Sequence, residues 1–245
     1  MNIRISIFSR ARSLVTSEVI PWLIFFGVGT LFVVIAYSHL PYMSDDAFIA
    51  LRYAKRLTQG YGLTWTDGER VEGYTDLFWV LLNALIGGIS GNFVWSARLL
   101  GTLGGLSVIL FASLSNKGFR LDSYRLLSSG LLLAGSVPLA IWSMGGLEHG
   151  FLAGLLAGAL FFLFRALDGE SIQQRDLMIA SLLFAFVCIT RADAPLYCAS
   201  AGLGMFICLV VEKKSLSALV RFASLPTLFV AGQMIFRIVY YGDWI

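Results

Sequence analysis

Long apolar runs without a charged residue determine the fold class of this chain. Residues 126–144 and 194–211 contain no Asp, Glu, Lys or Arg. Runs of about 17–25 apolar residues are long enough to cross a bilayer as helices. Across the whole chain 58% of the residues are hydrophobic and 13% are charged, about half the charged fraction of a typical soluble domain. The sequence therefore predicts an all-α, polytopic helical membrane protein.

The order of the apolar runs predicts seven spans in a single domain covering residues 1–245. Arg4, Arg10 and Arg12 precede the first run, which places the N-terminus in the cytoplasm because basic residues favour that side. This run is too long for the hydrophobic region of a signal peptide, so we expect it to remain as a span. The connections after residues 114, 167 and 211 then lie inside. The spans are expected at residues 20–40, 93–114, 126–143, 151–167, 177–190, 194–211 and 219–240.

Residues 77–89 form a further apolar run that is too short to count as a span. Thirteen residues make a helix of about 20 Å, whereas the hydrocarbon core is about 30 Å thick. Counting the run as a span would also move Lys117, Arg120 and Arg125 to the outer side. We therefore interpret it as a re-entrant or interfacial helix.

Residues 41–76 form the only long polar segment and carry six of the fifteen acidic residues. The topology places this loop on the external side. Ser44 is expected to cap an amphipathic helix at the membrane surface, with Asp45 and Asp46 in its first turn, where the helix dipole favours carboxylates. A small hairpin is expected at Asp67-Gly68. We interpret the loop as the catalytic segment of the protein.

Several ionisable residues are candidates for chemistry on this external side. Adjacent carboxylates such as Asp45 and Asp46 suit a general base or the binding of a divalent cation, Mg²⁺ or Mn²⁺. The alternative is that they only cap a helix. The other candidates lie at turns between spans, where a carboxylate is either solvated or paired: Glu148, His149, Arg191 and Asp193.

Other function classes receive no support from the residues. The chain has no basic run or motif typical of nucleic-acid binding. Two histidines without ligand spacing do not predict a zinc site, and His39 is interpreted as an interfacial residue. The cysteines all lie in apolar runs and are expected to be buried thiols. The glycines at residues 101–105 are expected to allow close packing of helices.

Four stretches of the external loop form a distinctive pattern: Ser44-Asp45-Asp46-Ala47-Phe48-Ile49, Arg52-Tyr53-Ala54, Gly60-Tyr61-Gly62-Leu63 and Glu69-Arg70-Val71-Glu72-Gly73-Tyr74-Thr75. They resemble the first external loop of GT-C glycosyltransferases, closest to the branch typified by mycobacterial terminal arabinofuranosyltransferases. Residues 145–150, 191–193 and 240–244 resemble that branch more weakly and in the same order. Such enzymes continue past this point, usually with a Pro-Asn-Thr motif, whereas this chain ends at Ile245. We therefore expect a fragment, a minimal module or a degenerate copy.

This resemblance implies a GT-C-like module in a bacterial inner membrane that faces the periplasm. The implied reaction transfers a sugar from a polyprenyl-phosphate donor to a hydroxyl of a glycan, lipid or protein acceptor. Asp45 would be the general base, and Asp46 would support it or share a metal ion. The resemblance assigns donor binding to Arg52, Lys55, Arg56, Glu148, His149, Arg191 and Asp193, and support of the loop or of the acceptor to Glu72 and Tyr74.

The alternatives to an enzyme are a catalytically inactive truncated copy, a membrane scaffold and a transporter. A transporter is expected to carry ionisable residues near the middle of its spans. In this sequence such residues are almost absent, and the acids gather at one face. The pattern favours interfacial chemistry over transport, and it leaves the inactive copy and the scaffold open.

Overall fold

The computed structural model describes residues 2–115 and 120–242, with side chains from residue 19 onward. Lys117, Asp243 and Trp244 lie outside the described residues. In the described part the protein is all-α, apart from a hairpin of two-residue strands, β1 (Leu114–Ser115) and β2 (Arg120–Leu121). The predicted fold class is confirmed at this level.

The helices follow the predicted order of apolar runs. The first two are α1 (Asn2–Ser38) and α2 (Ala47–Thr58), and the polar loop continues from α2 to α3. The predicted span at 126–143 is divided into a π-helical turn at Leu126–Gly130 and two short helices. The remaining elements are α3 (Leu77–Ser90), α4 (Phe93–Ser113), α5 (Ser123–Arg125), α6 (Leu131–Ala134), α7 (Val137–Met144), α8 (His149–Leu167), α9 (Gln174–Cys188), α10 (Pro195–Val211) and α11 (Ser217–Tyr241).

Several of these helices have the length and composition of membrane spans. Within the described residues four qualify: Val19–Ser38 of α1, α4, α8 and α11. The broken helix from Ser123 to Met144, bent by 62°, raises the number to five if it counts as one span. Helices α9 and α10 have 15 and 17 residues and are shorter than the roughly 20 residues that a span usually needs. These helices indicate an integral membrane protein.

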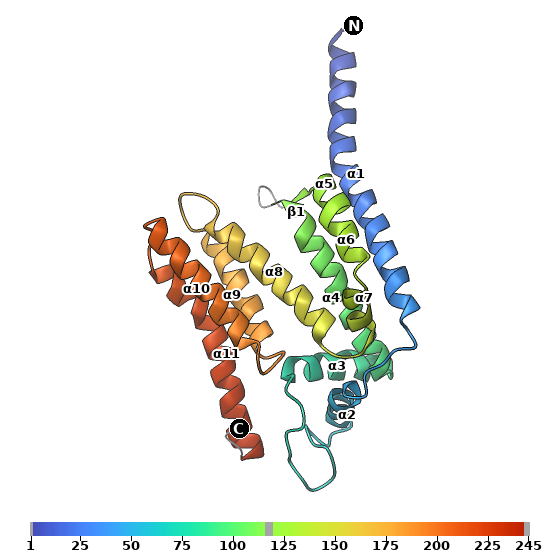
Figure 1. Ribbon diagram of the computed structural model, residues 1–245, viewed down its shortest axis with the longest axis vertical. Helices are drawn as coiled ribbons and strands as arrows, with labels where there is room; N and C mark the ends of the chain where they lie inside the picture. Colours follow the sequence, from blue (N-terminus) through green and yellow to red (C-terminus); the bar gives the residue numbers. More distant parts are fainter. Residues whose placement is uncertain (1, 116–119, 243–245) are drawn as a thin grey trace.

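The connections between the helices gather at two ends of the bundle. Figure 1 shows the β1–β2 hairpin and the α8–α9 and α10–α11 connections at the end that also holds the N-terminus. The polar loop, the α7–α8 turn, the α9–α10 turn and the C-terminal end of α11 lie at the opposite end. The predicted grouping of the connections into two sets is thus found in the structure.

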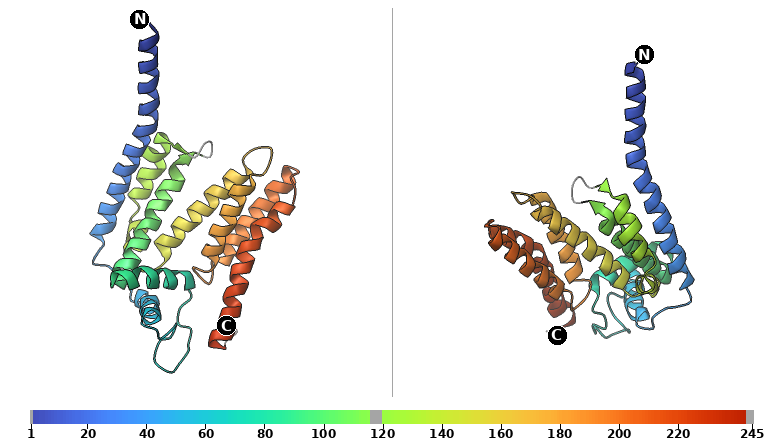
Figure 2. Two further views of the ribbon diagram at one scale, coloured as in Figure 1. Left: turned by 180° about the vertical axis from the view of Figure 1, so that it is seen from behind. Right: turned by 45° about the horizontal axis from the view of Figure 1, so that its top comes forward.

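Helix α3 lies across one end of the bundle instead of running along it. In Figure 1 and in the reverse view of Figure 2, α3 is roughly perpendicular to α4, the helix that follows it. The chain turns at Gly91, which has a positive φ of 71°, and Gly87 packs directly against the ring of Phe93. This orientation favours the interfacial interpretation of the run at residues 77–89.

The predicted surface helix is present as α2. Its inner face buries Ala50, Tyr53 and Ala54, whereas Arg52 and Lys55 are exposed. The predicted cap was wrong in detail: the helix begins at Ala47 with Asp46 as the N-cap residue, whose side chain makes no capping hydrogen bond. Ser44 lies two residues before this N-cap residue. Its backbone N–H instead donates to the carbonyl oxygen of Gly145 at 2.9 Å.

The predicted hairpin is a single turn, with an antiparallel bridge between Thr66 and Glu69 and a positive φ of 84° at Gly68. Just after α1, Nδ1 of His39 donates to the carbonyl oxygen of Ile35 at 2.8 Å. Because that oxygen can only accept, Nδ1 carries the hydrogen. This contact agrees with an interfacial role at the end of α1.

Glycines bring α4 into backbone contact with its neighbours, as predicted for residues 101–105. A Cβ atom added to Gly104 would lie 2.2 Å from the carbonyl oxygen of Gly150 and 2.4 Å from the Cα of Phe151. A Cβ at Gly101 would lie 2.3 Å from the carbonyl oxygen of Ser143. Because these neighbours are backbone atoms, they cannot move aside as a flexible side chain would. The contact fixes α8 and the turn before it against α4.

Gly104→Ala is therefore expected to destabilise the protein by about 1–3 kcal/mol, the usual cost of overpacking a tight contact. The thermal unfolding midpoint in detergent would fall by several degrees. Gly204→Ala in α10 is the control, because a Cβ there meets nothing within 4 Å. Equal midpoints for the two variants would contradict the close contact between α4 and α8.

Candidate functional site

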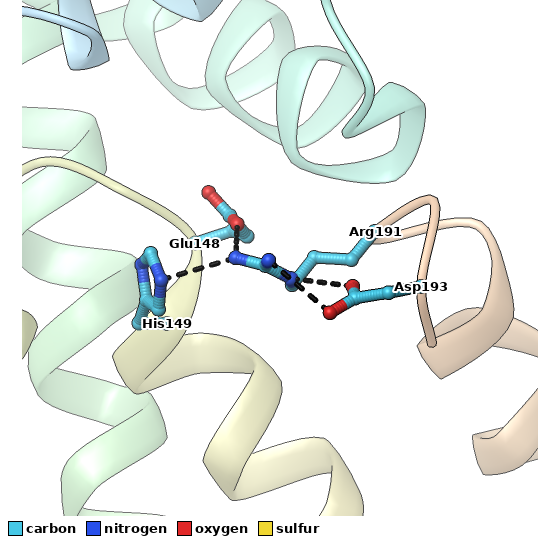
Figure 3. Close-up of polar contacts among 4 residues, drawn as sticks. All are labelled: Glu148, His149, Arg191 and Asp193. Atoms are coloured by element: carbon cyan, nitrogen blue, oxygen red, sulfur yellow. Dashed lines mark hydrogen bonds and ion pairs between the residues drawn. The ribbon is translucent and has the colours of Figure 1, made fainter. Parts of the chain in front are cut away.

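Arg191 is the centre of a charged cluster at the end of the bundle that carries the polar loop (Figure 3). Its Nη1 donates to Oε1 of Glu148 at 2.8 Å and to Nε2 of His149 at 3.0 Å. Its Nε and Nη2 donate to the two carboxylate oxygens of Asp193 at 2.8 and 3.3 Å. The structure thus brings together four of the predicted donor-binding residues, from the α7–α8 and α9–α10 turns.

These residues differ in burial, and burial determines how strongly each charge depends on its partner. The side chain of Glu148 is 8% exposed, that of Arg191 29% and that of Asp193 49%. The buried Glu148 carboxylate is therefore paired with a cation, as a charged group in a poorly solvated place requires. The guanidinium also holds the pKa of Asp193 below its ordinary value, mainly through the hydrogen bond, and that hydrogen bond raises the pKa of Arg191 in turn.

The contact with Arg191 also determines the tautomer of His149. An arginine can only donate, so Nε2 of a neutral His149 must be the acceptor and Nδ1 must carry the hydrogen. That Nδ1 is buried and has no hydrogen-bond partner among the described residues. The ring of His149 lies against the ring of Trp142, with centroids 4.7 Å apart. The imidazole is therefore held between an aromatic ring and a cation.

Two local features put these side chains in place. Gly146 has a positive φ of 84°, which allows the tight turn between α7 and α8 immediately before Glu148. On the other side, the backbone N–H of Phe78 in the first turn of α3 donates to the carbonyl oxygen of Ile189 at 3.1 Å. This bond joins the start of α3 to the α9–α10 turn, next to Arg191.

The same bond brings Asp76 into the cluster, a residue that the sequence analysis did not single out. Asp76 precedes α3, outside the spans, and is 6% exposed. Burial, together with repulsion from Glu148, raises the pKa of Asp76 to about 7, and attraction by Arg191 opposes this only in part. In the sequence, the only signal for Asp76 was its position directly before an apolar run. That position does not reveal which charged residues surround Asp76 in the fold.

The adjacent carboxylates Asp45 and Asp46 lie near this cluster but are not part of it. Both are exposed, and Oδ1 of Asp45 accepts the backbone N–H of Asp46 at 3.0 Å. The Ser44–Gly145 hydrogen bond ties them to the turn that carries Glu148. Among the described residues, no group of three or more His, Cys, Asp or Glu is arranged to hold a metal ion. Two exposed carboxylates alone supply fewer ligands than the six that Mg²⁺ takes.

The three basic residues of α2 do not lie with Arg191. Nε of Arg56 donates to Oγ1 of Thr64, and Nη2 pairs with Oδ1 of Asp67 at 2.5 Å, so Arg56 holds the polar loop. Arg52 and Lys55 line a groove against the α3–α4 turn. Helix α3 has 14 residues, a length of about 21 Å, and Asp76 stands at its opposite end.

Glu72 and Tyr74 connect the loop to the C-terminal end of α11. Oε2 of Glu72 accepts from Nε of Arg237 at 2.5 Å, and the hydroxyls of Tyr74 and Tyr241 are hydrogen-bonded at 3.1 Å. The hydroxyl of Tyr240 accepts the backbone N–H of Leu63 at 3.0 Å. Burial raises the pKa of Tyr74, so its hydroxyl stays neutral. Of the two predicted roles, these contacts favour loop support.

An apolar groove of about 560 Å³ opens beside the charged cluster, between α10 and α11. Cys188 and Pro195, which flank the Arg191 turn, line one end of it. The groove then follows α11 along Phe222, Pro226 and Val230. The cysteines Cys188, Cys198 and Cys208 are free thiols.

Comparison with protein-family models, with curated proteins and with solved structures finds no match for this chain.

The two neighbouring carboxylates of the cluster predict a pH dependence of stability. Asp76 keeps its proton in the folded state up to about pH 7 but loses it near pH 4 when unfolded, so the folded state binds more protons in between. The Asp76 contribution to stability is therefore full below about pH 4 and declines up to about pH 7. Asp76→Asn should remove this decline and raise the unfolding midpoint at pH 8. Asp45→Asn, at an exposed carboxylate, is the control, and identical profiles for wild type and Asp76→Asn would refute the assignment.

The Glu148–Arg191 pair predicts a strong coupling energy. Breaking a buried pair costs about 3–5 kcal/mol, and the partial exposure of Arg191 reduces the expected cost of Arg191→Gln to about 2–3 kcal/mol. The double variant Glu148→Gln/Arg191→Gln should recover part of this loss, because no unpaired buried charge remains. The matched cycle on Arg56 and Asp67, whose carboxylate is 81% exposed, should give about 1 kcal/mol or less. Additive effects at Glu148 and Arg191 would argue against a direct pair.

Proposed function

We propose that the chain is a membrane glycosyltransferase module that transfers a sugar from a polyprenyl-phosphate donor to a hydroxyl acceptor on the external face. The observation that carries the proposal is the Arg191 cluster (Figure 3) in a turn whose flanking residues, Cys188 and Pro195, line an apolar groove. A lipid-linked phosphate requires these two surfaces side by side, a cation for its headgroup and an apolar channel for its tail. The seven-span GT-C-like architecture belongs to the same proposal.

Arg191 is the proposed ligand of the donor phosphate. A guanidinium presents a planar fork of donors that suits phosphate oxygens, and in a partly buried site it stabilises the charge that develops on the leaving phosphate. Glu148 and Asp193 orient the guanidinium through the hydrogen bonds described above. As an acceptor of hydrogen bonds, Glu148 also suits the hydroxyl groups of a sugar.

Asp45 is the proposed general base, with Asp46 beside it. The Ser44–Gly145 hydrogen bond supports this assignment, because it ties the exposed carboxylates to the turn that carries Glu148. Asp45 takes the proton of the acceptor hydroxyl while the oxygen of that hydroxyl forms a bond to the anomeric carbon of the donor sugar. The bond between that carbon and the phosphate oxygen breaks, and polyprenyl phosphate leaves with the electron pair. No step of this reaction is assigned to a metal ion.

The test separates donor binding from transfer in the detergent-purified chain. Binding of a polyprenyl-phosphate sugar is measured for wild type, Arg191→Lys and Asp45→Asn, together with release of polyprenyl phosphate in the presence of hydroxyl acceptors. Arg191→Lys keeps the charge but loses the planar fork, so binding should weaken about tenfold. Asp45→Asn should bind like wild type and release polyprenyl phosphate at least about 100-fold more slowly, the usual contribution of a general base.

The two readouts have distinct consequences. Donor binding by wild type without any release would indicate a donor-binding module that lacks its acceptor half. Absence of donor binding in a folded wild-type protein would refute the glycosyltransferase proposal and favour a scaffold. Glu170→Gln is a useful control, since Glu170 is exposed in the α8–α9 connection at the opposite end of the bundle.

A further inference from the structure

A second groove, of about 480 Å³, lies between α2 and the turn that joins α3 to α4. Its apolar lining includes Phe48, Leu51, Trp65 and Phe93, and its charged lining consists of Arg52 and Lys55. It is separated from the Arg191 cluster by the length of α3, about 21 Å. The groove is therefore a distinct surface and takes no part in the function proposed above.

Within the described residues, the two cations in this groove have no acidic partner. Nε of Arg52 donates to the carbonyl oxygen of Trp65 at 2.9 Å, and the guanidinium lies 4.5 Å from the centre of the Trp65 ring. Its two terminal nitrogens, and the ammonium of Lys55, make no hydrogen bond or ion pair within the described part of the chain. Because Arg52 and Lys55 are three residues apart on α2, they lie on the same face of the helix. Both are exposed, so an anion can reach them.

The side chains around the groove are of the kind found where a membrane meets water. Phe93 and Val94 form the first turn of the candidate span α4, and Trp95 is 56% exposed. Phe48 on α2 is 52% exposed and Trp65 on the loop 40%. Exposed Trp and other aromatic side chains at the end of a span are typical of the headgroup region of a bilayer. Figure 2 shows α2 and α3 together at this end of the bundle.

We propose that this groove binds the headgroup phosphate of an anionic phospholipid from the surrounding membrane. Arg52 and Lys55 supply the positive charge that a phosphate needs, and the fork of Arg52 suits two phosphate oxygens. The apolar walls and the first turn of α4 accommodate the start of the acyl chains. A free phosphate ion would use the cations alone, whereas a lipid uses the cations and the apolar walls together. The lipid would hold α2 and its loop against the membrane.

The test measures lipid retention by native mass spectrometry of the full chain in detergent, with phosphatidylglycerol and phosphatidylcholine of identical acyl chains. Wild type should prefer phosphatidylglycerol. Lys55→Gln should reduce this preference about fivefold, the effect of removing one basic residue near an anionic lipid surface, and Arg52→Gln/Lys55→Gln should abolish it. Arg52→Lys keeps the charge and should retain part of the preference. Lys55 makes no contact that folding requires, and the unfolding midpoint of each variant verifies this.

The control is Arg175→Gln/Lys213→Gln, which removes two exposed cations from the opposite end of the bundle and should leave the preference unchanged. An unchanged preference in Lys55→Gln and in the Arg52→Gln/Lys55→Gln variant would overturn the proposal. Displacement of phosphatidylglycerol by millimolar inorganic phosphate, with the same dependence on Lys55, would assign the groove to a free anion instead. If the protein binds polyprenyl phosphate but not phosphatidylglycerol, and this binding requires Lys55, the groove is instead the site of the sugar donor.

Discussion

The backbone contact between α4 and α8 is the constraint on which the candidate site depends. Gly104 meets the carbonyl oxygen of Gly150 so closely that a single methyl group would collide with it. Because van der Waals packing replaces the hydrophobic effect between helices in a bilayer, such small-residue contacts fix the relative position of spans. Here the contact also fixes the turn before α8, and with it Glu148 and His149. The site is therefore positioned by glycines that carry no chemistry themselves.

Charge balance within the cluster explains its hydrogen bonds. One guanidinium faces three carboxylates: Glu148 and Asp193 receive its hydrogen bonds, and Asp76 receives only its longer-range attraction. Asp193 is half exposed and is stabilised by water, so the buried carboxylates Glu148 and Asp76 compete for the same cation. Burial and repulsion from Glu148 raise the pKa of Asp76 to about 7, so Asp76 binds a proton more readily than an exposed carboxylate. Glu148 and Asp193 alone already provide two carboxylates for the one guanidinium.

Most local features of this fold could be predicted from the sequence, apart from the cap of α2 and the break in residues 126–143, whereas the contacts between distant segments could not. The surface helix, the turn at Gly68, the close glycines and the flat α3 each follow from spacing or run length within one segment. Asp76 and the Glu72–Arg237 pair depend on partners farther along the chain, for which the sequence carries no signal. The pairing of Arg56 with Asp67 likewise could not be predicted, because helical spacing does not determine which way a long side chain turns. The division of the span at residues 126–143 reflects a kink before Pro138, where a proline cannot donate the helical hydrogen bond.

The flat orientation of α3 has the widest consequence for function. A span would carry its two ends to opposite sides of the membrane, whereas α3 keeps both ends at one surface, about 21 Å apart. Its first turn meets the α9–α10 break and brings Asp76 to Arg191, and its last turn meets α4 beside Arg52 and Lys55. One short apolar helix therefore separates two arginine sites on the same face. At the first, Arg191 is paired with Glu148 and Asp193, and the residues that flank its turn line an apolar groove. At the second, Arg52 and Lys55 have no acidic partner within the described residues, and exposed aromatic side chains lie beside them.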